Sequence, residues 1–454
     1  MTGWHAEGAF DLVIIGGGLA GLSCASEAIK RGKRPLLLES APRLGGRAAS
    51  HWDREWGCYL DNGPHLLVGA YQQTLAWLQQ LGVDGGLLRD KRYHFYTHKL
   101  GHHALELGQG WAAWKLLQGL AQLPEIEAKD LWRLKGLVGG VVHSHFRGGA
   151  EATVTQWLQR AGSPPALFER LWEPLCLATL NEGPGSADAT LFATVLKRLF
   201  LFNIAHAHPL YPQHDLNALL IDPAKRWIEQ HGGIIRTGVR LKAVEQGESA
   251  ITALILHSEG KPVRWVLPQA LPVVMALPVW SLGRILPQWV EEQGWTGWSA
   301  SPIVAVHLDY GQPMQQSAPM VGLPGSVSQW LCQWPVEGGQ QRISAAISAA
   351  YREVSWDTQR LIDTVHEEVM AQYQPISQQQ RVSLSGIKPR ARVIKTHRAT
   401  FASWPGVNQQ RPGPTTPWPN LYLAGDWTNT HLPATIEGAV LSGQQAAKQI
   451  FSAR

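Results

Sequence analysis

The sequence predicts an α/β fold with two interleaved domains, built around a buried parallel β-sheet. Its 454 residues are too many for one simple hydrophobic core. Residues 11–39 read as strand, helix and strand, the βαβ unit of a parallel sheet. After a largely helical middle stretch, the α/β pattern returns from residue 216 onward. An α/β protein with a largely helical region between its segments accounts for all three observations.

The βαβ unit carries a glycine pattern typical of dinucleotide binding. Residues 11–15 form a short apolar run suited to a buried strand. Gly16, Gly18 and Gly21 follow with the spacing G-x-G-x-x-G. The first glycine permits a sharp turn, the second leaves room for a pyrophosphate, and the third lets the helix pack close to the strand. The helix that begins there would direct free N–H groups and a positive dipole end at the phosphates.

An acidic residue completes this motif. The helical pattern ends near Gly32, and a second apolar run, residues 35–38, leads into Glu39. A carboxylate at this strand end can accept hydrogen bonds from ribose hydroxyls. The motif therefore predicts an ADP-containing dinucleotide and leaves FAD and NAD open.

Two further loops carry residues suited to a phosphate or a cofactor. Gly45, Gly46 and Arg47 suit a loop whose backbone lies against a pyrophosphate, with a cation beside it. Residues 61–65 read Asp-Asn-Gly-Pro-His, a cluster of turn-forming residues followed by a histidine. Residues 66–81 are then expected to form an apolar helix.

The middle of the chain is predicted to be mainly helical, from about residue 93 to residue 203. Thr153 and Gln156 have the spacing of a capping box. Ser163 and Pro164 suit the N-cap and first turn of a helix that runs through residue 180. Residues 190–203 are expected to form another apolar helix.

From residue 216, strand and helix patterns alternate again, as expected for an α/β region and a second region with its own sheet. Residues 234–243 are expected to form a strand and a turn, and residues 251–257 and 263–267 a hairpin. Further strands are expected at residues 272–276, 303–308 and 342–347, and the expected helices cover residues 219–230, 280–286 and 358–374.

The C-terminal segment indicates which dinucleotide binds. A short strand at residues 421–424 runs into Gly425 and Asp426, and a closing helix is expected after Ser442 and Gly443. Asp426 would lie against a ribityl chain or a phosphate, and N–H groups near residues 434–436 would point at a ring carbonyl. A helix N-terminus stabilises the negative charge that a reduced flavin carries on its pyrimidine side. NAD enzymes have no need of this second site, so the segment favours FAD.

Together these motifs resemble the flavoprotein group of amine oxidases, protoporphyrinogen oxidases and phytoene-type desaturases. Because the motifs lie at both ends of the chain, the resemblance covers nearly all of it. Within this group the sequence is similar to the squalene-associated FAD-dependent enzymes of hopanoid biosynthesis, described as hydroxysqualene dehydroxylases. The closer resemblance is carried by residues 61–65, 172–175, 178–181, 424–428 and 432–438.

The resemblance implies a Rossmann-type FAD-binding domain, discontinuous in sequence, with an inserted α+β substrate domain. The FAD-binding domain would consist of residues 8–92, 206–275 and 411–454. The substrate domain would consist of a mainly helical part, residues 93–205, and a sheet part, residues 276–410. The residues expected to bind FAD are Gly16, Gly18, Leu19, Ala20, Gly21, Glu39, Ser40, Gly45, Gly46, Arg47, Gly63, Pro64, His65, Val239, Gly425, Asp426, Ala434, Thr435 and Ile436.

The resemblance also implies a reaction. Hydroxysqualene, an apolar isoprenoid, would lose its allylic hydroxyl and gain a hydride from reduced FAD, which gives squalene. An acid would protonate the departing hydroxyl, and aromatic faces could stabilise the short-lived allylic cation. His65 is the candidate acid, and His307 and His431 are weaker candidates. The alternative role for His65 is packing or hydrogen bonding against the cofactor.

Three other functions compete with this one. A desaturase of a squalene- or phytoene-like polyisoprenoid would use the same hydride path in the oxidising direction. An amine oxidase is less expected, because the aromatic cage that surrounds the amine cannot be identified in the sequence. A scaffold with a vestigial FAD site is disfavoured because all the cofactor motifs are retained.

Composition limits the partners and the location. The cysteines Cys24, Cys58, Cys176 and Cys332 are scattered without a C-x-x-C pair, so neither a disulfide framework nor a metal site is expected. A reducing cytoplasm is the simplest setting. The first ten residues do not read as a signal peptide, and no apolar run reaches the roughly 18 residues of a membrane span. The net charge of +5 permits contact with anionic lipid headgroups, and no dense basic stripe indicates nucleic acid.

Tryptophan is unusually abundant, with 21 residues. Trp111, Trp114 and Leu117 with Lys115 form a short aromatic and basic stripe. Such a stripe suits either a membrane surface or the inner face of a domain. Peripheral contact with the inner face of the membrane is therefore one expectation. Because no second G-x-G-x-x-G occurs, an external reductant or an electron-donating partner is expected to reduce the flavin.

Overall fold

The computed structural model describes residues 10–83, 85–122, 126–133, 152–201, 203–268, 271–311, 318–334, 342–373 and 388–452. The predicted parallel sheet is present and has five strands, each paired in parallel with its neighbours. In sheet order they are β10 (Ile234–Thr237), β2 (Pro35–Glu39), β1 (Leu12–Ile15), β14 (Val273–Met275) and β20 (Leu421–Leu423). The strands β1, β14 and β2 are almost wholly buried, because both faces of a parallel sheet are covered.

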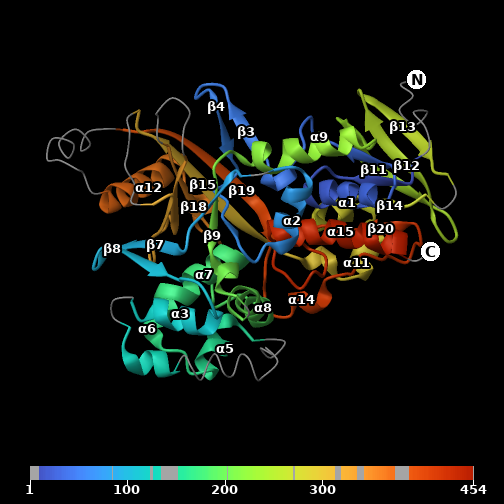
Figure 1. Ribbon diagram of the computed structural model, residues 1–454. Coiled ribbons are helices and arrows are strands. Elements are labelled where there is room, and N and C mark those ends of the chain that lie inside the picture. The colour runs from blue at the N-terminus through green and yellow to red at the C-terminus, as the bar shows by residue number, and fades with distance from the viewer. Residues whose placement is uncertain are drawn as a thin grey trace.

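Two long helices pack against each other beside this sheet. They are α1 (Leu19–Lys30) and α15 (Ile436–Ser452), and they lie side by side in Figure 1. The helices approach closely because Gly443 has no side chain: a Cβ atom there would lie 2.0 Å from the carbonyl oxygen of Ala20. The expectation that the closing helix begins after Ser442 and Gly443 is wrong, since α15 already begins at Ile436.

A second, mixed sheet of seven strands forms the other half of the molecule (Figure 1). In sheet order the strands are β19 (Arg390–Phe401), β15 (Ala300–Asp309), β18 (Arg342–Ile347), β17 (Trp330–Trp334), β16 (Met320–Gly322), β7 (Arg92–Thr97) and β8 (Gly101–Glu106). Helix α12 (Thr358–Gln372) covers this sheet and buries Leu361, Val365 and Val369 in one cluster with Val304 and Val306. Residue 374, the predicted end of this helix, lies outside the described residues.

A group of helices lies below both sheets in Figure 1. Its members are α3 (Ala112–Leu120), α5 (Val154–Arg160), α6 (Pro165–Leu167), α7 (Glu173–Leu180) and α8 (Ala189–Phe200), with a π-helical turn at Phe168–Trp172 between α6 and α7. The predicted capping box is confirmed, because the side chains of Thr153 and Gln156 each bond the other's backbone N–H. The predicted cap at Ser163 is wrong: Pro164 is the N-cap of α6, and the Ser163 hydroxyl accepts a hydrogen bond from the Trp172 indole instead.

Two further expectations for the secondary structure need correction. The stretch from residue 93 to residue 203 is not helical throughout, because β7 and β8 form a hairpin that joins the mixed sheet by a parallel pairing of β7 with β16. Of the helix expected at residues 66–81, only α2 (Gln72–Gln80) is helical. The residues before it form a strand instead: β5 (Leu67–Val68) pairs with β9 (Pro209–Pro212). At Gly69, which follows, a Cβ atom would lie 1.9 Å from the carbonyl oxygen of Ala205, so the chain passes close to a neighbouring segment there.

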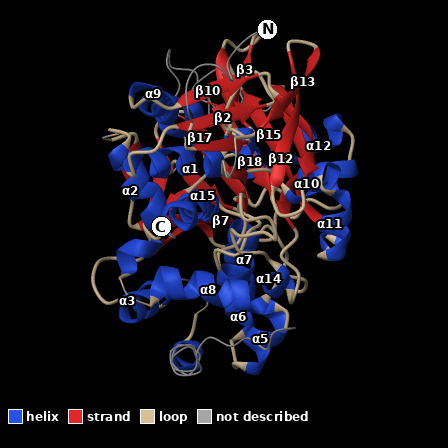
Figure 2. Cartoon of the chain, turned by 90° about the vertical axis from the view of Figure 1, so that its right-hand side faces the viewer, coloured by secondary structure: helices blue, strands red, loops and turns tan. Residues whose placement is uncertain are grey.

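Smaller elements complete the fold (Figure 2). The predicted hairpin is confirmed within a three-stranded antiparallel sheet. The remaining strands are β3 (Ser50–Asp53), β4 (Cys58–Asp61), β5 (Leu67–Val68), β6 (Leu87–Arg89), β9 (Pro209–Pro212), β11 (Arg240–Gln246), β12 (Ile251–Ser258) and β13 (Lys261–Val266), and the remaining helices are α9 (Asp222–Gln230), α10 (Val279–Ile285), α11 (Pro287–Glu292) and α14 (Val407–Gln410).

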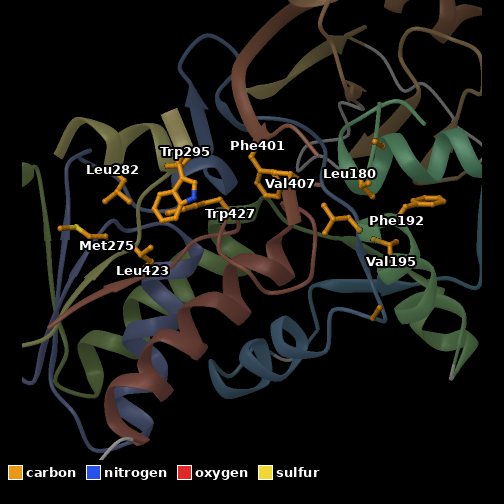
Figure 3. Close-up of a cluster of buried hydrophobic side chains, with 14 of the residues drawn as sticks. Leu180, Phe192, Val195, Met275, Leu282, Trp295, Phe401, Val407, Leu423 and Trp427 are labelled. Atoms are coloured by element: carbon orange, nitrogen blue, oxygen red, sulfur yellow. The ribbon is translucent and has the colours of Figure 1, made fainter. Parts of the chain in front are cut away.

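One hydrophobic core connects the parallel sheet with the helical group. Figure 3 shows Met275 and Leu423 at the sheet, Trp427 and Phe401 between, and Phe192 in the helical group. Edge-to-face indole pairs extend this core, among them Trp295 and Trp427 with ring centroids 5.3 Å apart. The parallel sheet and the helical group are therefore packed against each other through one continuous core.

Candidate active site

A cavity of about 1000 Å³ is lined by residues of the parallel sheet, the mixed sheet and the helical group. All of the residues expected to bind FAD line this cavity except Gly21. Segments that are far apart in the sequence, such as residues 16–20, 62–66 and 432–436, thus meet at one site. Among the described residues, no group of His, Cys, Asp or Glu side chains is arranged to hold a metal ion.

The glycines of the N-terminal motif divide into two kinds. Gly21 serves packing, because a Cβ atom there would lie 1.9 Å from the carbonyl oxygen of Gly16. Gly16 has a φ of +111°, and its Cβ atom would lie 2.3 Å from the carbonyl oxygen of Ala276. Gly18 differs, since a Cβ atom there would meet no atom of the chain within 4 Å, although the residue lines the cavity. Its missing side chain leaves space for a ligand to approach the backbone at the start of α1.

The carboxylate of Glu39 is held in place at the end of β2. One oxygen accepts a hydrogen bond from the Gly17 N–H at 2.7 Å, and the other accepts from the Ala41 N–H at 2.7 Å. The Ser40 hydroxyl donates to the latter oxygen at 3.1 Å. The oxygen bonded by Gly17 keeps a second acceptor site, so it can also accept from a ribose hydroxyl.

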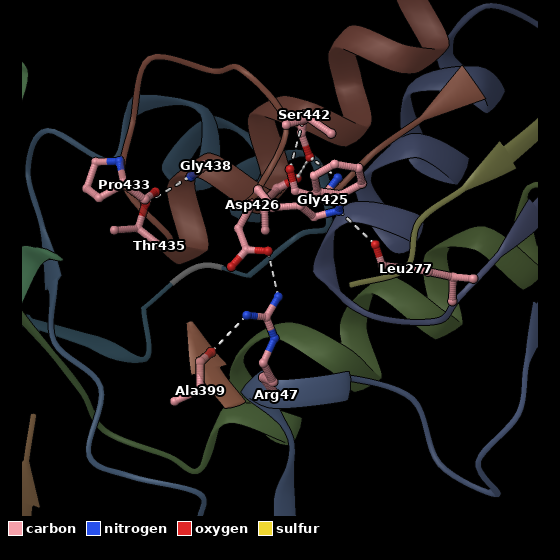
Figure 4. Close-up of polar contacts among 12 residues, drawn as sticks. Arg47, Leu277, Ala399, Gly425, Asp426, Pro433, Thr435, Gly438 and Ser442 are labelled. Atoms are coloured by element: carbon pink, nitrogen blue, oxygen red, sulfur yellow. Dashed lines mark hydrogen bonds and ion pairs between the residues drawn. The ribbon is translucent and has the colours of Figure 1, made fainter. Parts of the chain in front are cut away.

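An ion pair joins the two cofactor motifs from opposite ends of the chain. The guanidinium of Arg47 lies 2.6 Å from a carboxylate oxygen of Asp426 and also donates to the Ala399 carbonyl at 2.8 Å (Figure 4). Gly425 precedes Asp426 with a φ of +146°, and its N–H donates to the Ser442 hydroxyl at 2.9 Å. The pair fixes the Asp426 side chain at the cavity wall.

The N-terminus of α15 is directed at the same cavity. Ala434, Thr435 and Ile436 line it, and the hydroxyl of Thr435 accepts a hydrogen bond from the Gly438 N–H at 3.1 Å (Figure 4). Such a cap satisfies one of the N–H groups that a helix leaves without a partner in its own helix. The positive end of the helix dipole then faces the ligand.

The three histidine candidates have different surroundings. His65 lines the cavity, and its Nδ1 atom is buried without a hydrogen-bond partner among the described residues. Burial lowers the pKa of His65, an effect that the Gly63 backbone partly opposes. His307 does not line the cavity; its ring bonds the Ser344 hydroxyl at 2.7 Å and the Asp61 carbonyl at 3.1 Å. His431 is exposed and does not line the cavity either.

Sequence reasoning missed a polar group on the cavity wall formed by Tyr71, Arg198 and Glu437. The Glu437 carboxylate accepts hydrogen bonds from the Gln73 and Thr74 backbone N–H groups at 3.0 and 2.9 Å, and Arg198 lies 4.0 Å away. Burial raises the pKa of the Tyr71 phenol, and a hydrogen bond to the Thr435 side chain opposes this. Glu437 lay within the C-terminal motif and could have been found there, whereas no sequence pattern marks Tyr71 or Arg198.

The rest of the wall is mainly apolar. Many of these side chains come from the segment before α7, from α7 and α8, and from the two sheets. They include Phe95, Leu105, Leu107, Leu171, Leu175, Ala178, Val195, Leu199, Phe200, Ile303, Met320 and Trp330. A wall of this kind favours an apolar ligand.

The lining residues fit FAD. The open backbone at Gly18, the fixed Glu39 carboxylate, the two helix N-termini and the orphaned Nδ1 atom of His65 are the features that such a ligand would use. When bound, FAD supplies hydride-transfer chemistry. The chain's own residues would bind and orient FAD, and the apolar wall would exclude water.

Comparison with known proteins agrees with this site. The family described as flavin containing amine oxidoreductase matches residues 19–451. A hydroxysqualene dehydroxylase of Rhodopseudomonas palustris is 30% identical over 447 residues, which cover 97% of this chain and 98% of that protein. One from Sinorhizobium fredii is 28% identical over 97% of this chain and 98% of its own length. A 15-cis-phytoene desaturase of Narcissus pseudonarcissus is 24% identical over 98% of this chain and 80% of that protein.

Solved structures share the fold. An oxidoreductase from Methanosarcina mazei superposes with a TM-score of 0.71 at 15% identity and covers 95% of this chain and 98% of that one. A putrescine oxidase variant superposes with a TM-score of 0.69 at 14% identity over 98% and 99% of the two chains. The protein is thus a member of the flavin-containing amine oxidoreductase family, an FAD-dependent oxidoreductase whose resemblance to the hydroxysqualene dehydroxylases extends along nearly the whole chain.

Proposed function

We propose that this FAD-dependent oxidoreductase removes the allylic hydroxyl group of hydroxysqualene and so produces squalene. The carbon–oxygen bond breaks, one proton converts the departing hydroxyl into water, and a hydride from reduced FAD replaces it on the allylic carbon. One observation carries the proposal: a single cavity joins the dinucleotide motif to a mainly apolar wall. The names of the relatives at 30% and 28% identity support this substrate.

The chain's residues have separate tasks in this proposal. Gly18, Glu39, Arg47 and Asp426 would hold the cofactor. The apolar side chains of α7 and α8 would hold the isoprenoid chain and exclude water from the reacting carbon. For His65 we favour a hydrogen bond to cofactor or substrate over the role of a protonated acid, because burial lowers its pKa and leaves the ring neutral at pH 7.

Desaturation of a polyisoprenoid is the second candidate, and the desaturase relative at 24% identity supports it. Product analysis distinguishes the two. Reduced, anaerobic holoprotein is given hydroxysqualene, and oxidised holoprotein is given squalene in a separate reaction. We expect squalene from the first mixture and no dehydrosqualene from the second. Dehydrosqualene in the second mixture and unchanged hydroxysqualene in the first would establish the desaturase.

We also propose that an external reductant or electron-donating partner supplies the electrons, and that the protein touches the cytoplasmic membrane face. Within the described part of the chain, no helix has the length and apolarity needed to cross a bilayer. The expected aromatic stripe is exposed at the start of α3, where Trp111 and Trp114 have 69% and 51% of their surface accessible. Exposed tryptophans beside Lys115 suit a lipid interface with anionic headgroups.

A further inference from the structure

One buried arginine, Arg411, donates hydrogen bonds to several backbone carbonyl groups of a turn. This turn links Asp426 to residues 434–436, the two C-terminal segments expected to contact FAD. The Arg411 guanidinium donates to the carbonyl oxygens of Asp426 at 2.9 Å and Trp427 at 3.2 Å. It also donates to the Leu432 carbonyl at 2.6 Å and to the Thr428 carbonyl. Only 4% of the Arg411 surface is exposed, so these bonds form away from water.

The turn needs such a partner. Its carbonyl groups converge on one point inside the protein, and buried carbonyls without donors would destabilise it by the full desolvation of each group. The turn also contains His431 with a φ of +60°, a left-handed conformation that a non-glycine residue adopts only where its surroundings enforce it.

The position of the turn makes its shape important. At one end, Asp426 lines the cavity and pairs with Arg47. At the other end, Ala434, Thr435 and Ile436 line the cavity where α15 begins. The shape of the turn therefore sets the spacing between two groups that would hold the same FAD molecule, although Arg411 itself does not line the cavity.

Arg411 is well suited to this task and is hard to replace. Its planar fork offers five donors, whereas a lysine offers three from one point. Burial lowers the pKa of Arg411 to about 10, with Asp426 and Asp188 opposing the shift, so the side chain stays charged at neutral pH. The ring of Phe401 lies 5.1 Å from the guanidinium carbon, and Asn408 accepts a further hydrogen bond at 3.0 Å.

We infer that Arg411 is a positioning residue for FAD, which holds the 426–432 turn so that Asp426 and the N-terminus of α15 bind the cofactor together. The inference rests on the proposed placement of FAD along these groups and is independent of the identity of the substrate. Arg411 would act through the backbone of the turn, without touching the cofactor.

The test measures the FAD dissociation constant of purified holoprotein, from the recovery of flavin fluorescence on dilution, for the parent, Arg411→Lys and Arg411→Ala. Arg390→Ala is the control, because the Arg390 guanidinium, like that of Arg411, lies over an aromatic ring, that of Trp56, and does not line the cavity; its ion pair is with Asp309. Asp426→Asn is measured in parallel. Low millimolar guanidinium chloride is added to each variant, with sodium chloride as the salt control.

We expect the dissociation constant to rise about tenfold or more for both Arg411 variants and to stay unchanged for Arg390→Ala. Guanidinium should restore part of the affinity of Arg411→Ala alone, which a general loss of stability would not allow. If Arg411→Ala fails to fold, the FAD dissociation constant of Arg411→Lys tests the inference by itself.

Either of two results would overturn the inference. The first is an Arg411→Lys protein that binds FAD within about twofold of the parent; the second is an Arg411→Ala protein whose weakened binding does not respond to guanidinium. If Asp426→Asn weakens FAD binding while the Arg411 variants do not, FAD does lie beside Asp426, but Arg411 is not a positioning residue. If none of these variants weakens FAD binding, the proposed position of FAD beside Asp426 is wrong as well.

Discussion

His65 shows at the residue scale how burial changes the meaning of a sequence signal. A histidine after a turn of four polar or small residues suggested an acid, and the structure places it in the cavity wall with an orphaned Nδ1 atom. Because its pKa is lowered from 6.5, the ring loses its second proton below that pH. A charged imidazolium would then be scarce at pH 7, which favours the hydrogen-bonding role.

This role has a testable pH dependence. We expect turnover of hydroxysqualene by the parent and by His65→Gln to follow parallel profiles between pH 7 and 8.5, with the variant lower throughout, since a ring whose pKa is lowered from 6.5 is mainly neutral in that range. Single-turnover reoxidation of the reduced holoprotein supplies the rates. A parent rate that falls with rising pH, together with a flat profile for the variant, would instead identify His65 as the acid.

Asp61 should make the stability of the protein depend on pH. Burial raises the pKa of this carboxyl from 3.8 to about 6. Hydrogen bonds that it accepts from the Ser50 hydroxyl and the Leu216 N–H oppose the shift. Between these values the folded state binds more protons than the unfolded state, so stability falls as pH rises through this window. Above pH 6 the whole loss of folding stability is present, and it amounts to at most about 3 kcal/mol.

The substitution Asp61→Asn removes this titration and keeps an acceptor oxygen at the same place. We expect the melting temperature of the variant, relative to that of the parent, to increase from pH 4.5 to pH 7. The lowered pKa of His307 acts in the opposite direction, but it is common to both proteins and cancels in the difference. A difference that stays constant across this range would show that the carboxyl does not titrate in this way.

At the scale of elements, the contact between α1 and α15 positions two helix N-termini at one cavity. The substitution Gly443→Ala would place a Cβ atom 2.0 Å from the Ala20 carbonyl oxygen and 2.3 Å from the Ser23 hydroxyl. The helices must then separate, at a cost of about 1–3 kcal/mol. We expect a lower melting temperature and faster loss of FAD on heating.

Gly413→Ala is the control for this prediction. A Cβ atom at Gly413 would meet no atom within 4 Å, and this glycine does not have a positive φ. Thermal unfolding followed by flavin fluorescence reports both variants. Equal midpoints for Gly443→Ala and the parent would show that the close approach of the two helices is not needed.

The elements also show what a single sequence can reveal. The fingerprint βαβ unit was predicted well because its signals are local: an apolar run, three glycines and an acid within 29 residues of chain, residues 11–39. The β7–β8 hairpin was missed although its two strands are neighbours in the sequence, whereas its place in the mixed sheet depends on β16, which lies far along the chain. Arg411 carries no pattern either, since its acceptors are backbone carbonyls that only the folded turn brings together.

At the scale of the whole molecule, the exposed tryptophans predict one membrane-facing side. Trp111 and Trp114 belong to the helical group, whereas Trp52, 50% exposed, lies on the β3–β4 hairpin, which Figure 1 shows on the opposite side of the molecule. We expect the double substitution Trp111→Ser and Trp114→Ser to weaken binding to vesicles that contain anionic lipid, and Trp52→Ser to leave it unchanged.

Vesicle flotation of the holoprotein measures this binding. A loss in the double variant alone supports a membrane surface at α3. If the parent and both variants float equally, these tryptophans do not contact a bilayer, and a protein interface within an assembly is the environment that fits them.

The division of the chain into five segments, with boundaries at residues 92, 205, 275 and 410, stays a prediction.

The order of strands in the parallel sheet has a consequence for folding of the protein during translation. Strand β1 is made first with β2, yet its other neighbour β14 and the next strand β20 are translated much later. Until then the growing chain presents an open, apolar strand edge, the kind of surface that associates wrongly and attracts chaperones. A pocket that includes Asp426 and Ile436 does not exist before those residues leave the exit tunnel. Flavin loading is therefore among the last events of biogenesis, and a shortage of FAD would leave completed but unfilled chains rather than stalled nascent ones.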